Sequence, residues 1–423
     1  MKYFFFWCVG LLCAFPLWSQ PQEEKVSMKS IGSVQFFLQN NPTTLPIIEL
    51  NATSVLELHF DEWGKVPRNF FYTFLLCNAD WSPAQLTPFD YIRGFQQNRI
   101  GQYRVSSLTR TPYVHYQANL PERSALPSRS GNYLLVVYAD GDPQKIAFTK
   151  RFWVVDNQLT VFAQVQEPFD ISKARTHQKI QFEVNAAKLS LASPRQISVT
   201  VLQNGRWDNA RTGLQPSFIR GNQLAFNPES ETVFPAGKEY RWLDFQSFRF
   251  LSDRMADIDR TQDPVLVAVK PDQARGSLRY AYFRDFNGFT QMGTTDAPNP
   301  WWQGDYGWVV FNFVPANGKA FPDKDVFLLG ALSGNLLNDS TKMQWNSEKM
   351  VYQKSLLLKQ GYYNYCYATG KPGLPGESQW TEGDHWETEN EYHLFVYYRS
   401  LGGRHDELLA VKTINSLRDR LPR

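Results

Sequence analysis

Short apolar runs rich in aromatic and β-branched residues recur along nearly the whole chain, and clusters of Gly, Pro, Asn and Asp separate them. Three clear examples are residues 325–330, 356–367 and 392–398. Runs of this kind between turn residues are typical of strands in an antiparallel sandwich. None of these three runs carries a nucleophile, a metal-ligand set or a phosphate loop. The pattern therefore favours an all-β protein that binds a partner over one that converts a substrate.

The first part of the chain, residues 29–156, predicts an immunoglobulin-like β-sandwich. Turn sequences at 40–42, 61–64 and 140–143 separate its apolar runs. Regular spacing of short strands over about 125 residues is the pattern of such a sandwich. The expected strands are 33–38, 55–60, 70–78, 113–120, 131–139 and 148–155.

Two further sandwiches are expected, at residues 157–290 and 291–423. In the middle segment, residues 178–184 and 196–202 alternate between apolar and polar positions, as half-buried strands do. The last segment resembles the sandwiches of carbohydrate-binding and early-set modules. Helical periodicity is scarce, and the one helix expected is a short one within residues 406–421. We therefore predict tandem immunoglobulin-like or early-set-like antiparallel β-sandwiches with little helix.

The first 19 residues have the features of a signal peptide. Lys2 supplies a positive start, residues 3–17 form an apolar core, and Ser19 offers a small residue for cleavage. The core is shorter than the roughly 20 apolar residues that a membrane-spanning helix needs. Cys13 follows two leucines where a lipoprotein signal needs a small residue, so we expect no direct lipid anchor. The sequence predicts export from the cytoplasm.

Charge and cysteine content exclude several classes of partner and cofactor. The formal net charge is +3 at pH 7 and the basic residues are dispersed, which argues against nucleic acid or anionic lipid as a partner. No phosphate loop, Rossmann turn or C-x-x-C pair occurs, so no nucleotide or redox cofactor is expected. Cys77 and Cys366 remain after export. They could pair, or stay as two buried free thiols, the interpretation that we favour.

One acidic stretch, residues 384–393, could bind a divalent metal if it formed a strand. Imidazole and carboxylate groups would then share one face, namely those of His385, Glu387, Glu389, Glu391 and His393. Zinc sites usually draw on more than one strand, so a solvated acidic loop is the preferred interpretation.

A hydrolytic triad could also be assembled from His59, Asp61 and Ser82. No G-x-S-x-G elbow accompanies them, and chain order says nothing about geometry. We therefore assign no catalytic, cofactor or metal residues.

Four residues are candidates for contact with a partner: Arg206, Trp207, Trp301 and Trp302. The first two follow a turn-forming Asn-Gly pair and could be displayed on a hairpin tip, where Trp and Arg are typical interface anchors. Alternatively, Trp207 folds back on its own sheet. The second pair suggests sugar stacking, but adjacent residues of a strand point to opposite faces, so packing within the protein is the alternative.

An ordered set of motifs runs along nearly the whole mature chain. It includes Cys77-Asn-Ala-Asp-Trp81, Ser130-Gly-Asn-Tyr133, Gln203-Asn-Gly-Arg-Trp-Asp-Asn-Ala210, Asp285-Phe-Asn-Gly288 and Leu358-Lys-Gln-Gly-Tyr-Tyr-Asn-Tyr365. With these motifs the chain resembles the plug protein of the type IX secretion system of Bacteroidetes, a family formerly described as a domain of unknown function. One departure is residues 235–239, where a Gly-Gly-Asn-Glu-like turn is expected.

The resemblance implies a periplasmic protein, monomeric within its complex, that binds the giant outer-membrane barrel translocon and closes its periplasmic opening. It implies no cofactor and carries over no site residue. The alternative is an exported carbohydrate-binding β-sandwich protein, and an enzyme ranks behind both. A sugar binder needs an exposed coplanar aromatic pair near Trp301, and an enzyme needs a concave pocket with convergent polar groups. A plug needs an extended surface that faces its partner.

Overall fold

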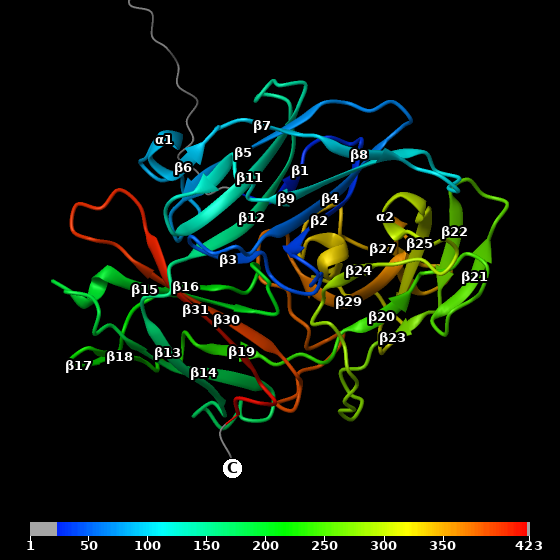
Figure 1. Ribbon diagram of the computed structural model, residues 1–423. Coiled ribbons are helices and arrows are strands. Elements are labelled where there is room, and N and C mark those ends of the chain that lie inside the picture. The colour runs from blue at the N-terminus through cyan, green and yellow to red at the C-terminus, as the bar shows by residue number, and fades with distance from the viewer. Residues whose placement is uncertain (1–22, 421–423) are drawn as a thin grey trace, which may run out of the picture.

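The computed structural model describes residues 23–420 and consists almost entirely of strands (Figure 1). The predicted signal peptide, with Cys13, lies outside the described residues. The strands form three β-sandwiches, which confirms the all-β fold class. In Figure 1 the first sandwich lies at the top, the second at the lower left and the third at the right. Within residues 23–420, no helix has the length and apolar character needed to cross a membrane.

Two sheets packed face to face form the first sandwich, and alternate residues of their strands fill the core between them. One sheet contains, in spatial order, β1 (Lys25–Val26), β12 (Ile146–Val155), β11 (Gly131–Ala139), β5 (Phe70–Cys77) and β7 (Asn98–Ile100), with β3 (Ile47–Glu49) beside β12. The other contains β2 (Ile31–Leu38), β4 (Leu56–Trp63), β9 (Tyr113–Leu120) and β8 (Gln102–Val105). Helix α1 (Pro88–Tyr91) and a ribbon of β6 (Ile92–Gly94) and β10 (Ala125–Pro127) complete this sandwich.

The second sandwich combines two distant parts of the chain. One sheet contains β13 (Thr160–Gln166), β14 (His177–Asn185), β18 (Gln223–Phe226) and β17 (Phe218–Arg220), with β19 (Val233–Pro235) beside β14. The facing sheet contains β16 (Arg211–Leu214), β15 (Ile197–Gln203), β30 (Glu391–Tyr398) and β31 (Glu407–Asn415). The short helix η1 (Pro194–Gln196) leads into β15.

The third sandwich lies between these two parts of the sequence. One sheet contains β20 (Arg241–Asp244), β29 (Gly361–Gly370) and β24 (Thr290–Met292), with β26 (Asp325–Leu329) beside β29. The facing sheet contains β21 (Met255–Asp259), β22 (Val265–Val269), β25 (Tyr306–Val314), β28 (Val351–Lys359) and β27 (Gln344–Asn346), with β23 (Asp272–Gln273) beside β25. Its helices are α2 (Pro300–Gln303) and η2 (Ala331–Ser333).

This topology inserts the third sandwich into the second and corrects the predicted division at residue 290. β15 pairs antiparallel with β30, so the second sandwich is completed only after the chain returns from the third. Val199 lies opposite Val396 in this pairing, and both side chains enter the same core. Without β30 and β31 that core would face water, which is the physical reason for the return. The predicted segments 157–290 and 291–423 therefore each mix strands of two sandwiches.

Strands β11 and β30 are buried on both faces, which explains why their sequences are continuous apolar runs. Every residue of β11 is buried, because one face points into the first core while Leu134 and Val136 on the other face pack against the second sandwich. β30 is enclosed in the same way, with Leu394 in the second core and Phe395 against the first sandwich. Apolar runs without alternation thus occur where the two sandwiches meet.

The C-terminal segment forms a strand in place of the helix expected within residues 406–421. β31 pairs antiparallel with β30 along nearly its whole length. Its residues Leu409 and Ile414 enter the second core. Helix propensity is a weak preference that tertiary burial overrides, and here the core decides.

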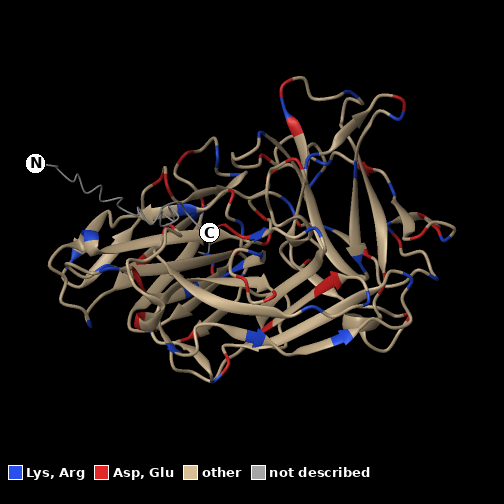
Figure 2. Ribbon diagram, turned by 90° about the horizontal axis from the view of Figure 1, so that it is seen from above, with Lys and Arg blue, Asp and Glu red and all other residues tan. Residues whose placement is uncertain are grey.

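Charged residues of both signs are interspersed over the view of Figure 2, which looks at the molecule from above. This distribution matches the small formal net charge of +3. A dispersed pattern offers no broad single-sign field in this view to attract a polyanion.

Candidate functional site

The outer face of the β2-β4-β9-β8 sheet is polar, and part of it is buried against the third sandwich. Strand alternation sends Leu58 and Phe60 of β4 into the first core, so His59 and Asp61 point the other way. On the neighbouring strand β9, His115 lies opposite Asp61. Lys359, at the end of β28, reaches this face from the third sandwich.

Asp61 is the centre of the contact between the two sandwiches. Its Oδ1 accepts a hydrogen bond from Nδ1 of His115 at 2.7 Å. Its Oδ2 lies 2.5 Å from Nζ of Lys359 and accepts a hydrogen bond from the Tyr306 hydroxyl at 2.5 Å. We call Asp61, His59, His115, Tyr306 and Lys359 the polar seam. All five are buried, so each polar group must find its partner within the protein.

The two imidazoles of the polar seam extend this network. Nδ1 of His59 lies 3.1 Å from Nε2 of His115. When His115 donates from Nδ1 to Asp61, its Nε2 is free to accept a hydrogen bond from Nδ1 of His59. This assignment leaves both rings neutral and satisfies three of their four nitrogens. The Nε2 of His59 then faces Glu57 at 3.6 Å.

Burial sets the charge states within the polar seam. Burial lowers the pKa of His59 to about 3, and the neighbouring His115 contributes in the same direction. Burial also lowers the pKa of His115, against the opposing effect of Asp61. Burial alone would raise the pKa of Asp61, but Lys359 and His115 hold it below its ordinary value. The polar seam therefore contains one buried ion pair beside two neutral imidazoles at pH 7.

Helix α2 covers the polar seam. Asn299 caps this helix by accepting a hydrogen bond from the backbone N–H of Trp301, and Pro300 occupies its first turn. The Trp301 ring then stacks on His59, with ring centroids 3.7 Å apart and an interplanar angle of 4°. The Tyr113 hydroxyl donates to the carbonyl of Gly304 just after the helix, at 2.6 Å.

Backbone contacts beside α2 strengthen the same interface. The carboxylate of Asp305 accepts hydrogen bonds from the backbone N–H groups of Arg110 at 2.6 Å and Thr111 at 3.1 Å. Lys359 also donates to the carbonyl of Trp301 at 2.5 Å. Each sandwich therefore supplies acceptors for donors of the other, and the interface has one defined geometry.

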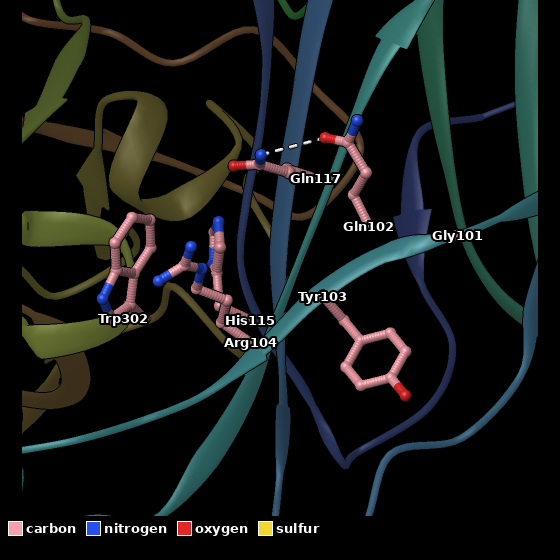
Figure 3. Close-up of a pocket in the computed structure, with 7 residues that line it drawn as sticks. All are labelled: Gly101, Gln102, Tyr103, Arg104, His115, Gln117 and Trp302. Atoms are coloured by element: carbon pink, nitrogen blue, oxygen red, sulfur yellow. Dashed lines mark hydrogen bonds between the residues drawn. The ribbon is translucent and has the colours of Figure 1, made fainter.

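Beyond α2 the polar face is open and forms a cavity of about 280 Å³. Figure 3 shows its lining, with Arg104 and Trp302 side by side and the amides of Gln102 and Gln117 joined. The Arg104 guanidinium lies 4.6 Å from the centroid of the Trp302 ring. Nε2 of Gln117 donates to Oε1 of Gln102 at 3.0 Å. Buried His115 also lines this cavity.

A second interface, between the first and second sandwiches, is aromatic. The rings of Trp81 and Trp153 of the first sandwich meet Trp207 of the second, with centroids 5.5 and 6.2 Å from it. Phe395 stacks on Trp153 at 4.9 Å. We call Trp81, Trp153, Trp207 and Phe395 the aromatic seam. The Arg151 guanidinium lies over two of its rings, at 4.4 Å from Trp81 and 4.6 Å from Trp207.

The structure thus corrects the expectation that Arg206 and Trp207 are displayed on a hairpin tip. Trp207 packs into the aromatic seam instead, because a large ring gains more by burial between sandwiches than by exposure. Arg206 is largely buried and forms a bidentate ion pair with Asp208, at 2.9 and 2.6 Å. Trp207 thus joins the second sandwich to the first, whereas Arg206 pairs within its own loop.

Trp301 and Trp302 lie on α2 and contact the first sandwich. One face of the Trp301 ring is occupied by His59, and Arg104 lies over Trp302. Since each indole already stacks on another side chain, the pair does not provide the flat exposed platform that a sugar binder needs. Of the four predicted contact residues, Trp302 alone lines the open cavity.

Residues 384–390 form neither the strand that a metal site would need nor the solvated loop that we expected, since β30 begins only at Glu391 and part of the segment is buried. Trp386 is buried, and Gln178 donates to its carbonyl and to that of Thr388, at 2.7 and 2.8 Å. The segment is a packed connection from the third sandwich back to the second. Within residues 23–420, no group of three His, Cys, Asp or Glu side chains is placed to hold a metal ion.

Of the remaining sequence candidates, Ser82 lies apart from the other members of the suggested triad, and the two cysteines are buried and unreactive. Ser82 lies in the loop after β5, where its hydroxyl and Asp80 interact at 2.5 Å, so it forms no triad with the polar seam. Cys77 and Cys366 are both free and buried, as the favoured interpretation predicts. Burial raises the pKa of each thiol to about 12, which keeps both protonated and unreactive.

Sequence reasoning assigned no role to Lys359 or His115. The expected turn at 61–64 is wrong, because β4 continues to Trp63. A signal was nevertheless present, since Glu57, His59 and Asp61 are polar at alternate positions of this strand. Such alternation indicates a polar face. It does not show that another sandwich covers that face, because the partner Lys359 lies 298 positions away in the sequence.

Comparison with known proteins places the chain in a family. The family model for the type 9 secretion system plug protein 1st domain matches residues 31–156, the first sandwich. A crystal structure of a hypothetical protein from Parabacteroides merdae ATCC 43184 is similar over the whole fold, with a TM-score of 0.89 and 33% identity. The similarity covers 94% of this chain and 100% of that one. No curated protein matches. The chain belongs to the type IX secretion system plug protein family.

Proposed function

We propose that this protein binds the outer-membrane barrel translocon of the type IX secretion system and closes its periplasmic opening by steric obstruction. Family membership supports a role in type IX secretion. In this proposal the protein acts in the periplasm and reaches the outer membrane through the barrel, without a lipid anchor of its own. It works by binding, and it catalyses no reaction.

The observation that carries this proposal is that two buried seams join the three sandwiches. A channel wide enough for folded cargo cannot be obstructed by one loop, so a plug needs a broad and stiff body. The polar seam fixes the third sandwich to the first through Asp61 and Lys359. The aromatic seam fixes the second to the first through Trp153 and Phe395.

The strength of the seams indicates that the sandwiches move together. The buried ion pair of the polar seam adds little net stability, but its two charges and their hydrogen bonds are all satisfied in one docking geometry. Each aromatic pair adds about 0.5–1.5 kcal/mol beyond the burial of its area. Opening the aromatic seam would forfeit several such pairs together with the burial of their rings, so in this proposal the sandwiches present their outer surface as one body.

The test is permeability of the outer membrane in a bacterium that uses type IX secretion. Four strains are compared: the parent, a deletion of this protein, a deletion of the barrel, and the double deletion. Entry of a large hydrophilic dye or antibiotic that the outer membrane normally excludes is measured in each. We expect the deletion of this protein to admit the dye and the double deletion to exclude it, because the barrel is the hole.

A leak of equal size with and without the barrel would contradict the proposal. An intact permeability barrier in the single deletion would also contradict it, provided that the barrel is still assembled in that strain. Immunoblotting of outer-membrane fractions supplies that control. Re-expression of the wild-type protein should restore exclusion of the dye.

A further inference from the structure

Strand β8 is an unpaired edge of the first sandwich. The spatial order of its sheet is β2-β4-β9-β8, so among the described strands β8 pairs with β9 alone. All four residues of β8 are exposed, including the large side chains of Tyr103 and Val105 at 46% and 44%. An exposed edge of this kind is a template for another strand.

The hydrogen-bond register identifies which backbone groups face outward. Just beyond β8, the N–H of Ser106 donates to the carbonyl of Tyr113 at 2.8 Å. In an antiparallel pair, bonded and non-bonded positions alternate. Gln102 and Arg104 are therefore the positions that bond β9, while Tyr103 and Val105 direct their N–H and C=O groups away from the sheet. No described residue forms a backbone hydrogen bond with these outward groups.

The side chains beside this edge select for negative charge. Arg104 stacks on Trp302 at the open cavity and has no ion-pair partner within residues 23–420. Arg104 is also the one charged residue of β8, so the charge on this strand is positive. A guanidinium held by an aromatic ring offers its N–H fork to a carboxylate at little further loss of side-chain freedom.

We propose that the edge of β8 receives an extended acidic segment of the translocon barrel, which adds a strand to the first sandwich. The outward groups of Tyr103 and Val105 form the new ladder, and a carboxylate of the incoming strand binds Arg104 at the cavity. This is strand addition, in which main-chain bonds supply affinity and side-chain pockets supply specificity. The inference rests on the proposed function, because it assigns the barrel as the partner.

The test measures binding of purified variants to the purified barrel in detergent. Tyr103→Pro removes an outward N–H without touching the bonds to β9, and Arg104→Glu reverses the charge at the cavity. Each should weaken binding about tenfold or more. The matched control is Arg220→Glu, an exposed arginine on the edge strand β17 of the second sandwich, which should bind within about twofold of wild type.

Amide hydrogen exchange on the wild-type chain tests the same point without a substitution. The N–H groups of Tyr103 and Val105 should exchange quickly in the free protein and slowly in the complex. If the wild type binds the barrel but these amides stay unprotected, or both β8 variants bind as wild type does, the inference is wrong and the proposed function stands. If the wild type does not bind the barrel at all, the proposed function itself fails.

Discussion

Asp61 shows how one buried carboxylate can define the contact between two sandwiches. It accepts a hydrogen bond from His115 and meets both Lys359 and Tyr306. A buried charge of this kind is expensive to leave unpaired and gives little net stability over an apolar pair. Its main contribution is to specificity, because only one relative orientation of the two sandwiches satisfies the polar groups of every residue in the polar seam.

Replacing Lys359 by Met tests this role. The substitution keeps the apolar stem and removes the charge, so Asp61 stays buried beside neutral groups. We expect the free energy of unfolding to fall by about 3–5 kcal/mol, measured by chemical denaturation. The matched control is Lys145→Met, because Lys145 pairs with Asp140 at the surface at 3.7 Å and should change stability by less than about 1 kcal/mol. Equal effects at the two sites would refute the assignment.

The neutral imidazoles of the polar seam predict a loss of stability in mild acid. The pKa of His59 is about 3 in the folded protein, far below the value of about 6.5 expected in the unfolded chain. The unfolded state therefore binds more protons as the pH falls, and stability is lost below about pH 6.5. The expected slope from this residue is about 1.2 kcal/mol per pH unit between pH 6 and 5.

The measurement is chemical denaturation at several pH values of the wild type and of His59→Gln. The variant keeps a hydrogen-bonding side chain at this position and removes one titrating group. The variant should take up about one proton fewer on unfolding than the wild type does. Its stability should therefore fall less steeply with decreasing pH over the same interval. Parallel curves for the two proteins would show that His59 is not held neutral by the fold.

Single residues also mark the limit of sequence reasoning. The alternation that makes His59 and Asp61 one polar face is visible in the sequence, and the suggested triad with Ser82 is wrong because Ser82 lies in the loop after β5. The true partners, His115 and Lys359, depend on strand pairing and on the docking of two sandwiches. Such long-range contacts follow from the whole fold and leave no local signal.

Among the strands, β30 and β31 determine how the second and third sandwiches are connected. They supply half of the facing sheet in the second sandwich, although more than a hundred residues of the third sandwich separate them from β16. Leu394 and Val396 of β30 and Leu409 of β31 belong to the second core. The first and third cores receive no residue from either strand.

Truncation before β30 should therefore unfold the second sandwich and leave the third intact. A chain that ends at residue 385 loses the apolar cover of β14 and β15 while it keeps every strand of the third sandwich. Limited proteolysis should then cut rapidly within residues 160–235 and slowly within 241–370, and the full chain is the control. Rapid cleavage in both regions, or in neither, would contradict the inserted topology.

Strand existence was predictable here, but strand pairing was not. Apolar runs between turn residues located β5, β9, β11 and β26 correctly, because local pattern encodes extended structure. The single run expected at 356–367 is instead divided at Gln360 between β28 and β29. The run at β30 is apolar on both faces, so its sequence does not reveal which neighbours it has. The short helix expected in the last segment is absent for a related reason, since burial in a shared core outweighed local preference.

The whole molecule behaves as one body in this account, and spin labels can test that. Val66, Phe162 and Leu266 are exposed and lie one in each sandwich, so Cys at these positions gives three pairs of labels. The native thiols, which are buried with pKa values raised to about 12, should not react. Each pair should give a single narrow distance distribution. Broad or divided distributions in the wild type would show that the sandwiches move independently.

The most direct test of the central claim is the ionic conductance of the purified barrel in a planar bilayer. The barrel alone should conduct steadily, and this protein added to the periplasmic side should abolish the current in a concentration-dependent way. Heat-denatured protein and the Arg104→Glu variant serve as controls, the second being expected to require higher concentration. Closure by the native protein is the result that the account predicts. An unchanged current with saturating native protein bound to the barrel would contradict it.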